Sequence, residues 1–166
     1  AITFDYVPDI DETSYLEFLP KADGLVIRTQ RLTAQHIATA PNLKVVSRHG
    51  VGYDAIDEFA LKMRNIPLTI VGDVNSRTVA EHTMMLLLAA SRCLVKSVNT
   101  LREGDWAQRN SFEPKEGFGK TLLIIGYGRI GQHLSALAQA FGIKVLAYDP
   151  FVSDGAFDGV TRVGSI

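Results

Sequence analysis

The chain has 166 residues, with 17 Lys and Arg against 18 Asp and Glu, and a formal net charge of -1 at pH 7. This length is enough for one domain with a solid core or for two small ones, and the balanced charge gives no reason to expect a nucleic-acid partner. The single cysteine, Cys93, excludes an internal disulfide and a cysteine-based zinc site, and we expect a reducing, cytoplasmic location.

Strands and helices are predicted to alternate over the first half of the chain. The helix of 33–40 is expected to be capped by Thr33. The next helix, 54–65, is expected to use Asp54 as its N-cap and Asn65 as a left-handed residue at its C-terminal end. This alternation predicts a parallel sheet with helices packed on it. Its strands are expected at 24–29, 43–47 and 66–71.

A longer helical pattern runs from Val79 to Gly104, and Ser76 or Thr78 is expected to cap its start. The pattern is apolar nearly all round over Met84–Ala90, so we expect it to be buried on several sides, between domains or between subunits. That run is far shorter than the ~20 residues that cross a bilayer, and we expect no membrane segment. The sequence therefore predicts a first α/β domain, a long helix with a linker, and a second α/β domain, at 1–78, 79–119 and 120–166.

Three glycines lie between an apolar run and an amphipathic one in the stretch TLLIIGYGRIGQHLSALAQAFGIKVLAYDP, 121–150. The pattern places Gly126, Gly128 and Gly131 at the strand-to-helix turn of a βαβ unit. In such a turn they allow, in order, a tight bend, the approach of a pyrophosphate to the backbone, and close packing of the helix on the strand. Asp149 ends the second strand, where an acid accepts hydrogen bonds from an adenosine ribose. The alternative interpretation is that the glycines only close a turn and Asp149 caps a strand.

The residues around Asp149 also bear on the choice of dinucleotide. A carboxylate at this position repels a 2′-phosphate, whereas an arginine nearby accommodates one. The next two residues, Pro150 and Phe151, offer no cation. We therefore expect NAD to bind in preference to NADP.

A second glycine-containing turn, SRHGVGYD at 47–54, also follows a predicted strand and precedes a helix. Gly50 and Gly52 permit backbone conformations in which successive N–H groups converge on an anion, so a small carboxylate would bind the amides around Val51 and Gly52. A plain strand-to-helix turn explains the same residues equally well. Asn75, before the long helical pattern, is free to point into a cleft, although a loop Asn is more often a turn residue. The four histidines are scattered, and we expect no metal site.

Taken together, these motifs resemble the D-isomer-specific 2-hydroxyacid dehydrogenases. The resemblance covers about 24–151, and its blocks are LTAQHIATAPNLKVVSRHGVGYDAID, VNSRTVAEHTMMLLLAASR, GDW and GKTLLIIGYGRIGQHLSALAQAFGIKVLAYDP. The phosphoglycerate dehydrogenase and hydroxypyruvate/glyoxylate reductase branches look nearest. The resemblance implies a partial flavodoxin-like substrate domain and the first half of a Rossmann NAD-binding domain. The long helix that links them commonly packs in a two-fold dimer in this family.

The resemblance also implies roles for individual residues. The backbone at Val51 and Gly52 would hold the substrate carboxylate, and Asn75 would lie near the substrate and the nicotinamide. Val79 would contact the nicotinamide side of the cofactor. The remaining cofactor positions are the glycines, the two residues whose backbone meets the pyrophosphate and the ribose acid, namely Gly126, Gly128, Gly131, Arg129, Ile130 and Asp149.

The activity implied is hydride transfer between NAD and C2 of a D-2-hydroxy acid or 2-oxo acid. An alternative from the same family is an NAD-sensing corepressor, in which the fold mediates protein partnership. The family's catalytic Arg, Glu and His fall in blocks after Ile166, and its first strand and helix would precede Ala1–Val7. We therefore expect the chain to be a piece of a longer protein and to have no dehydrogenase activity by itself.

Overall fold

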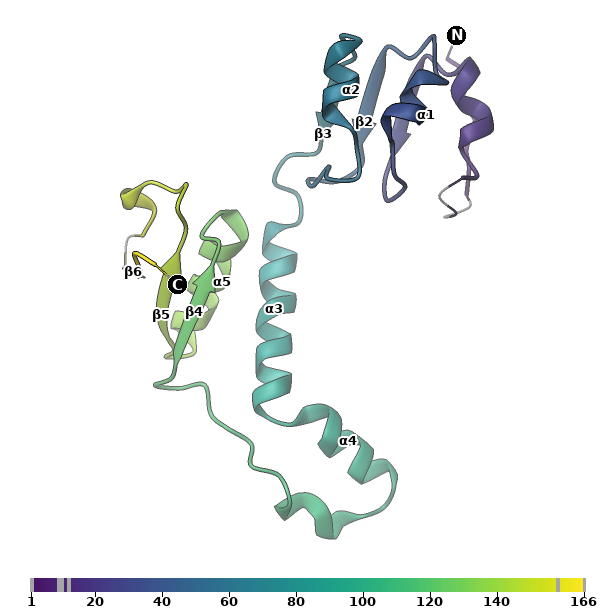
Figure 1. The fold of residues 1–166 in the computed structure, drawn as a ribbon. Helices are drawn as coiled ribbons and strands as arrows, with labels where there is room; N and C mark the ends of the chain where they lie inside the picture. Colours follow the sequence, from purple (N-terminus) through teal and green to yellow (C-terminus); the bar gives the residue numbers. More distant parts are fainter. Residues whose placement is uncertain (1, 9–10, 12, 158, 166) are drawn as a thin grey trace. The chain divides into compact units, whose positions relative to one another are not determined.

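The computed structural model describes residues 2–8, 11, 13–157 and 159–165. The chain forms two compact units, Ala1–Asp73 and Val74–Ile166. Each unit combines helices with its own three-stranded sheet, and every strand pair in both sheets is parallel (Figure 1). The predicted α/β class and the predicted parallel pairing are therefore confirmed.

The sheet of the first unit has the order β1-β2-β3, so strands that follow one another in the chain are also neighbours in space. Its register pairs Val26 with Ser47 and Ser47 with Thr69. Buried side chains from strands and helices form one core, which includes Leu19, Ile37, Val46 and Leu61. The elements are η1 Leu16–Lys21, β1 Gly24–Ile27, α1 Ala34–Ala38, β2 Val45–Arg48, α2 Glu58–Met63 and β3 Leu68–Ile70.

Two of the predicted helix ends in this unit are confirmed. The Thr33 hydroxyl accepts a hydrogen bond from the His36 N–H at 3.3 Å and caps α1. Asn65 follows α2 with a φ of 53°, in the left-handed region that asparagine tolerates better than most residues.

The predicted start of α2 at Asp54 is wrong, because the helix begins one turn later. Its N-cap is Asp57, whose carboxylate accepts a hydrogen bond from the Ala60 N–H at 2.9 Å. The backbone before it is occupied by pairing with a distant segment. Leu32 N–H donates to Ala55 O at 2.9 Å, and Asp57 N–H donates to Leu32 O at 2.8 Å. A helix beginning at Asp54 would break this pairing.

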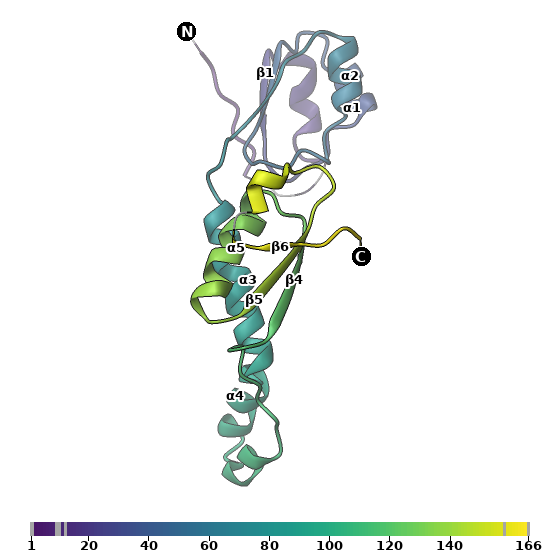
Figure 2. The ribbon, with the colours of Figure 1, turned by 90° about the vertical axis from the view of Figure 1, so that its left-hand side faces the viewer.

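The second unit places the sheet β4-β5-β6 beside two helices. Helix α5 packs against β4, β5 and α3 (Figures 1 and 2). The core that results includes Met84, Ile124, Leu134, Ala138 and Ala147. The elements are α3 Ser76–Ser91, α4 Leu94–Arg102, η2 Trp106–Asn110, β4 Thr121–Ile125, α5 Arg129–Ala140, β5 Lys144–Tyr148, η3 Asp154–Phe157 and β6 Thr161–Arg162.

The long helical pattern is not one helix, which corrects the sequence prediction. Helices α3 and α4 are bent by 61° at Cys93, which has the left-handed angles φ 53° and ψ 34°. Ser91 O, which Val95 would use in a continuous helix, instead accepts a hydrogen bond from Lys115 N–H at 2.7 Å. The linker that returns along α4 therefore supplies the partner that makes the break possible.

The start of α3 also differs from the prediction. The helix begins at Ser76 with Asn75 as its N-cap, and no side chain caps it. Neither Ser76 nor Thr78 is therefore the capping residue that we expected. Over the described residues, no single helix has the length and hydropathy to cross a membrane. Helices α3 and α4 reach those values only when they are counted together across their bend.

Candidate functional site

The turn between β4 and α5 requires a glycine at its first position. Gly126 has a φ of 91°, which side chains with a Cβ rarely adopt. Its N–H donates to Tyr148 O at 2.8 Å, so the turn is held against the end of β5. The tight bend predicted for Gly126 is confirmed.

The other two glycines of the turn differ in what surrounds them. A Cβ on Gly131 would lie closer than 3.0 Å to the Gly126 carbonyl oxygen and at 3.3 Å from Ile124 Cγ2. Close packing of helix on strand, as predicted for Gly131, is therefore confirmed. Gly128 has no heavy atom within 4 Å of its Cβ position, so its backbone faces open space.

The amino end of α5 lies directly after this open space. Gly128 is the N-cap of α5, and no side chain caps the helix there. The N–H groups of the first helical turn, which begins with Arg129 and Ile130, have no intrahelical acceptor. Unpaired N–H groups and the helix dipole together favour an anion at such an end. The turn therefore has the donors and the space that a phosphate group needs.

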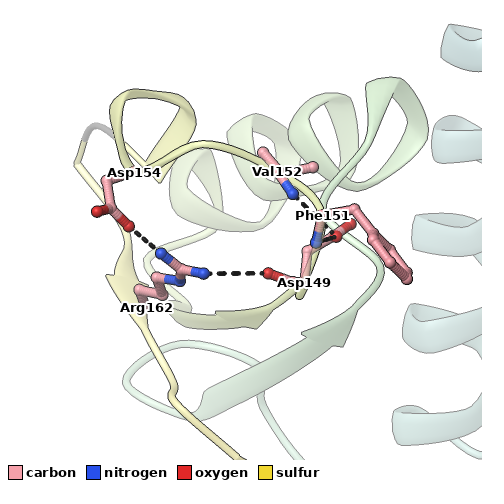
Figure 3. Close-up of polar contacts among 5 residues, drawn as sticks. All are labelled: Asp149, Phe151, Val152, Asp154 and Arg162. Carbon is pink, nitrogen blue, oxygen red and sulfur yellow. Dashed lines mark hydrogen bonds and ion pairs between the residues drawn. The ribbon is translucent and has the colours of Figure 1, made fainter.

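Asp149 directly follows β5 and connects the end of this strand to the glycine turn. Figure 3 shows its contacts with Phe151 and Val152. Its Oδ2 accepts a hydrogen bond from the Tyr127 N–H at 2.8 Å. Its Oδ1 accepts from the Phe151 N–H at 2.8 Å and from the Val152 N–H at 3.2 Å. The Phe151 N–H, followed by those of Tyr127 and Val152 and the charge of Arg162, lowers the pKa of Asp149 against the opposing effect of desolvation. The carboxylate is therefore held in its ionised form, oriented by the backbone.

A cation missed by the sequence analysis lies beside Asp149. Arg162 donates from Nη2 to Asp149 O at 3.4 Å and pairs through Nη1 with Asp154 (Figure 3). Its guanidinium also lies over the Phe157 ring. Arg162 lies 13 residues after Asp149 in the chain, well beyond Pro150 and Phe151. Arg162 reaches this position because β6 pairs with β5, and no local pattern signals that contact.

The turn of 49–52 in the first unit follows β2. Neither Gly50 nor Gly52 is among the residues with positive φ, so the turn does not use the left-handed backbone at its glycines. His49 N–H donates to Ile27 O at 2.8 Å, and Val71 N–H donates to Gly50 O at 3.2 Å. Among the residues that the structure describes, none accepts a hydrogen bond from the N–H groups of Val51 and Gly52. These two amides are therefore available to a ligand.

Asn75 is the N-cap of α3, and Val79 lies on the first turn of this helix. Val79 N–H donates to Asn75 O at 2.9 Å, and both side chains are exposed. Within the described part of the chain, no group of three or more His, Cys, Asp or Glu side chains has the arrangement of a metal site.

The family model described as D-isomer specific 2-hydroxyacid dehydrogenase, catalytic domain, matches residues 1–162. The chain belongs to this family. The family assignment from the sequence motifs is therefore confirmed.

Two curated relatives illustrate how close the match is. The chain is 42% identical over 149 residues to the D-3-phosphoglycerate dehydrogenase of Mycobacterium leprae, covering 89% of this chain and 28% of the relative. It is 37% identical over 142 residues to the hydroxypyruvate reductase of Thermotoga maritima, covering 85% of this chain and 46% of the relative. The chain thus spans about a quarter to a half of the length of these relatives.

Solved structures of similar fold contain dinucleotides. The D-lactate dehydrogenase of Aquifex aeolicus, in complex with NAD and lactic acid, matches with a TM-score of 0.82 at 27% identity, covering 90% of this chain and 45% of that one. The NAD-dependent formate dehydrogenase of Staphylococcus aureus, in complex with NAD, matches with a TM-score of 0.83 at 29% identity, covering 93% and 48%. An acyclic imino acid reductase in complex with NADPH and D-Arg matches with a TM-score of 0.81 at 27% identity, covering 92% and 49%.

Proposed function

We propose that this chain is the part of an NAD-dependent D-2-hydroxyacid dehydrogenase that binds the cofactor phosphates and the substrate carboxylate. The first unit would be part of a flavodoxin-like substrate domain. The second would contain the first half of a Rossmann domain, with α3 and α4 as the linking and dimerisation segment. When bound, the nicotinamide would supply or accept the hydride at C2 of the substrate.

The observation that carries this proposal is the geometry around the glycine turn. Gly126 makes the bend, Gly131 lets α5 approach β4, and Gly128 leaves space at the amino end of α5. Asp149 is ionised and fixed by backbone N–H groups at the end of the neighbouring strand. A turn that only joined a strand to a helix would not need α5 to lie so close to β4 and also leave the amino end of α5 open and uncapped.

The cofactor residues would act by position and charge. The backbone N–H groups of Arg129 and Ile130 would meet the pyrophosphate, and Asp149 would accept hydrogen bonds from the adenosine ribose. Val79 would contact the nicotinamide side. Arg162 is engaged by Asp154, which leaves the Asp149 carboxylate to repel a 2′-phosphate. These features support a preference for NAD over NADP.

The substrate would be a small 2-hydroxy or 2-oxo acid. Its carboxylate would accept hydrogen bonds from the free N–H groups of Val51 and Gly52, and Asn75 would lie near the substrate. Fixing the carboxylate orients C2 for hydride transfer. We assign no catalytic acid or base within residues 1–166.

We also propose a cytoplasmic homodimer that joins through α3 and α4. Support for the dimer comes from large apolar side chains that these helices expose, including Leu86, Leu94 and Val95. The single cysteine supports the location in a reducing compartment.

Titration with NADH and NADPH, followed by the fluorescence of the reduced nicotinamide, tests the cofactor assignment. NADH should bind more tightly than NADPH, and Asp149→Ala should weaken NADH and reduce the difference. Tighter binding of NADPH by the unmodified protein would contradict the assignment.

An assay of NADH oxidation with hydroxypyruvate or glyoxylate tests the activity. Residues 1–166 alone are expected to show no turnover, since none of them matches the family's catalytic Arg, Glu or His. Turnover near the median enzyme rate of ~10 s⁻¹ would mean that catalytic residues have been overlooked. Turnover by a chain that carries those three residues would favour the enzyme over an NAD-sensing binding protein.

A further inference from the structure

The side chain of Arg48, the last residue of β2, folds over the turn that follows it. Its Nε donates to Gly52 O at 3.0 Å, and its Nη1 donates to His49 O at 2.8 Å. The guanidinium therefore joins the first and last residues of the 49–52 turn. Arg48 is half-buried as a residue, and both of these hydrogen bonds lie at the exposed surface of the turn.

In the 49–52 turn, carbonyl oxygens accept hydrogen bonds while two N–H groups have no acceptor in the described part of the chain. Arg48 occupies the oxygens of His49 and Gly52, and Val71 N–H occupies that of Gly50 at 3.2 Å. The N–H groups of Val51 and Gly52 have no acceptor among the described residues. With three of its four carbonyl oxygens engaged and two N–H groups free, the turn offers donors to an anion.

The charge of Arg48 adds to this effect. In the part of the chain that the structure describes, no carboxylate lies within ion-pair distance of this guanidinium. Its positive charge is therefore not cancelled by a fixed partner. The guanidinium therefore adds a positive charge to the turn that carries the two free amides, which favours an anion there.

Gly50 makes room for the guanidinium. A Cβ at this position would lie 2.8 Å from Arg48 Nη1 and 2.9 Å from Arg48 Cζ. Because Gly50 does not have a positive φ, backbone strain is not the reason for a glycine here. A residue with a Cβ at position 50 would instead displace the Arg48 guanidinium from the turn.

We propose that Arg48 is the positioning residue of the carboxylate site, holding the Val51 and Gly52 amides toward the substrate and covering the carbonyl oxygens that would repel it. This inference rests on the proposed function, because it needs a carboxylate at Val51 and Gly52. Arg48 acts through the turn, and glycine at position 50 leaves room for its guanidinium.

Oxalate is a suitable probe, because it has the carboxylate of the proposed substrates but does not undergo hydride transfer. Its affinity for the full chain is measured by calorimetry, and its position by the ¹⁵N–¹H signals of the Val51 and Gly52 amides. Arg48→Met should weaken oxalate binding roughly 10- to 100-fold. This is the range expected when the Val51 and Gly52 amides no longer donate hydrogen bonds to the charged carboxylate. Arg48→Lys should recover only part of this loss, since an ammonium lacks the fork that reaches two carbonyls.

Gly50→Ala distinguishes a specific role of Arg48 from a general loss of stability. Its methyl group should expel the guanidinium and weaken oxalate to a similar extent, yet add little when Arg48 is already Met. The matched control is Arg64→Met, which removes another guanidinium that donates to carbonyls, those of Ile37, Ala40 and Pro41. This control should lower stability and leave oxalate affinity unchanged.

The outcomes separate the two proposals. Oxalate that leaves the Val51 and Gly52 signals of the unmodified protein unchanged would overturn the carboxylate site itself, and with it the role of Arg48. Normal oxalate binding by Arg48→Met, or additive effects of Arg48→Met and Gly50→Ala, would overturn the role of Arg48 alone. Non-additive losses with shifted amide signals at the turn would support it.

Discussion

Substitution of Gly131 by alanine should destabilise the second unit, although alanine is the better helix former. The new Cβ would lie closer than 3.0 Å to the Gly126 carbonyl oxygen and at 3.3 Å from both Gly126 C and Ile124 Cγ2. The oxygen belongs to backbone and cannot rotate away, and Gly126 N–H is bonded to Tyr148 O at 2.8 Å. Either α5 moves away from β4 or the turn is distorted.

The magnitude follows from two opposing effects. Overpacking of this kind costs typically about 1–3 kcal/mol. Replacing glycine by alanine within a helix returns about 0.8–1.0 kcal/mol through backbone entropy. Because a backbone clash lies toward the upper end of the cost, we expect Gly131→Ala to lower the free energy of unfolding by roughly 1–2 kcal/mol. NADH affinity should fall as well, since movement of α5 displaces its amino-terminal N–H groups.

Urea unfolding followed by circular dichroism, together with NADH titration, checks this expectation. Gly128→Ala is the matched control, because nothing lies within 4 Å of its Cβ position. It should change stability by no more than about 0.5 kcal/mol, as for substitutions outside packed sites, yet weaken NADH by filling the space for the pyrophosphate. A Gly131→Ala protein as stable as the unmodified one would refute the role of close packing. Unchanged NADH affinity in Gly128→Ala would refute the phosphate site.

Three further predictions concern single side chains. Asp149→Asn should lower stability at neutral pH. The folded pKa of Asp149 is depressed, so its contribution is complete above the unfolded value of about 3.9 and is lost as the pH falls through the folded pKa. Urea unfolding from pH 7 into the acid range should therefore show a difference that is largest at pH 7 and shrinks as the pH falls. Cys93→Gly should raise the free energy of unfolding by roughly 0.5–1 kcal/mol. It relieves a left-handed backbone that costs ~1–2 kcal/mol, against the entropy cost of a glycine, ~0.5–1 kcal/mol. Cys93→Ser should give no gain in stability, and a Cys93→Gly protein less stable than the unmodified one would contradict the reasoning. Asp154→Ala should free Arg162 and raise the affinity for NADPH relative to that for NADH. The loss of stability should be small, since the ion pair is exposed. If titrations of both cofactors give an unchanged ratio of the two dissociation constants, Arg162 does not reach the 2′ position.

Features with a short-range cause could be predicted from the sequence. The alternation of apolar runs and helical patterns determined the α/β class and the parallel sheets, because parallel strands need helical crossovers between them. Thr33 caps α1 through a hydrogen bond to a residue three positions away, and Asn65 adopts the left-handed backbone that its residue type tolerates. The spacing of Gly126 and Gly131 placed them at the turn of a βαβ unit, where the bend and the close approach are both needed.

Only the tertiary structure decided the features that depend on residues far apart in the chain. Cys93 interrupts the long helical pattern because Lys115, from the returning linker, takes the carbonyl of Ser91. Helix α2 is capped by Asp57 and not by Asp54, because the preceding backbone pairs with Leu32. Arg162 comes to lie beside Asp149 through the pairing of β6 with β5. Periodicity and capping patterns report neighbours within about one helical turn, whereas these contacts follow from how the chain returns on itself.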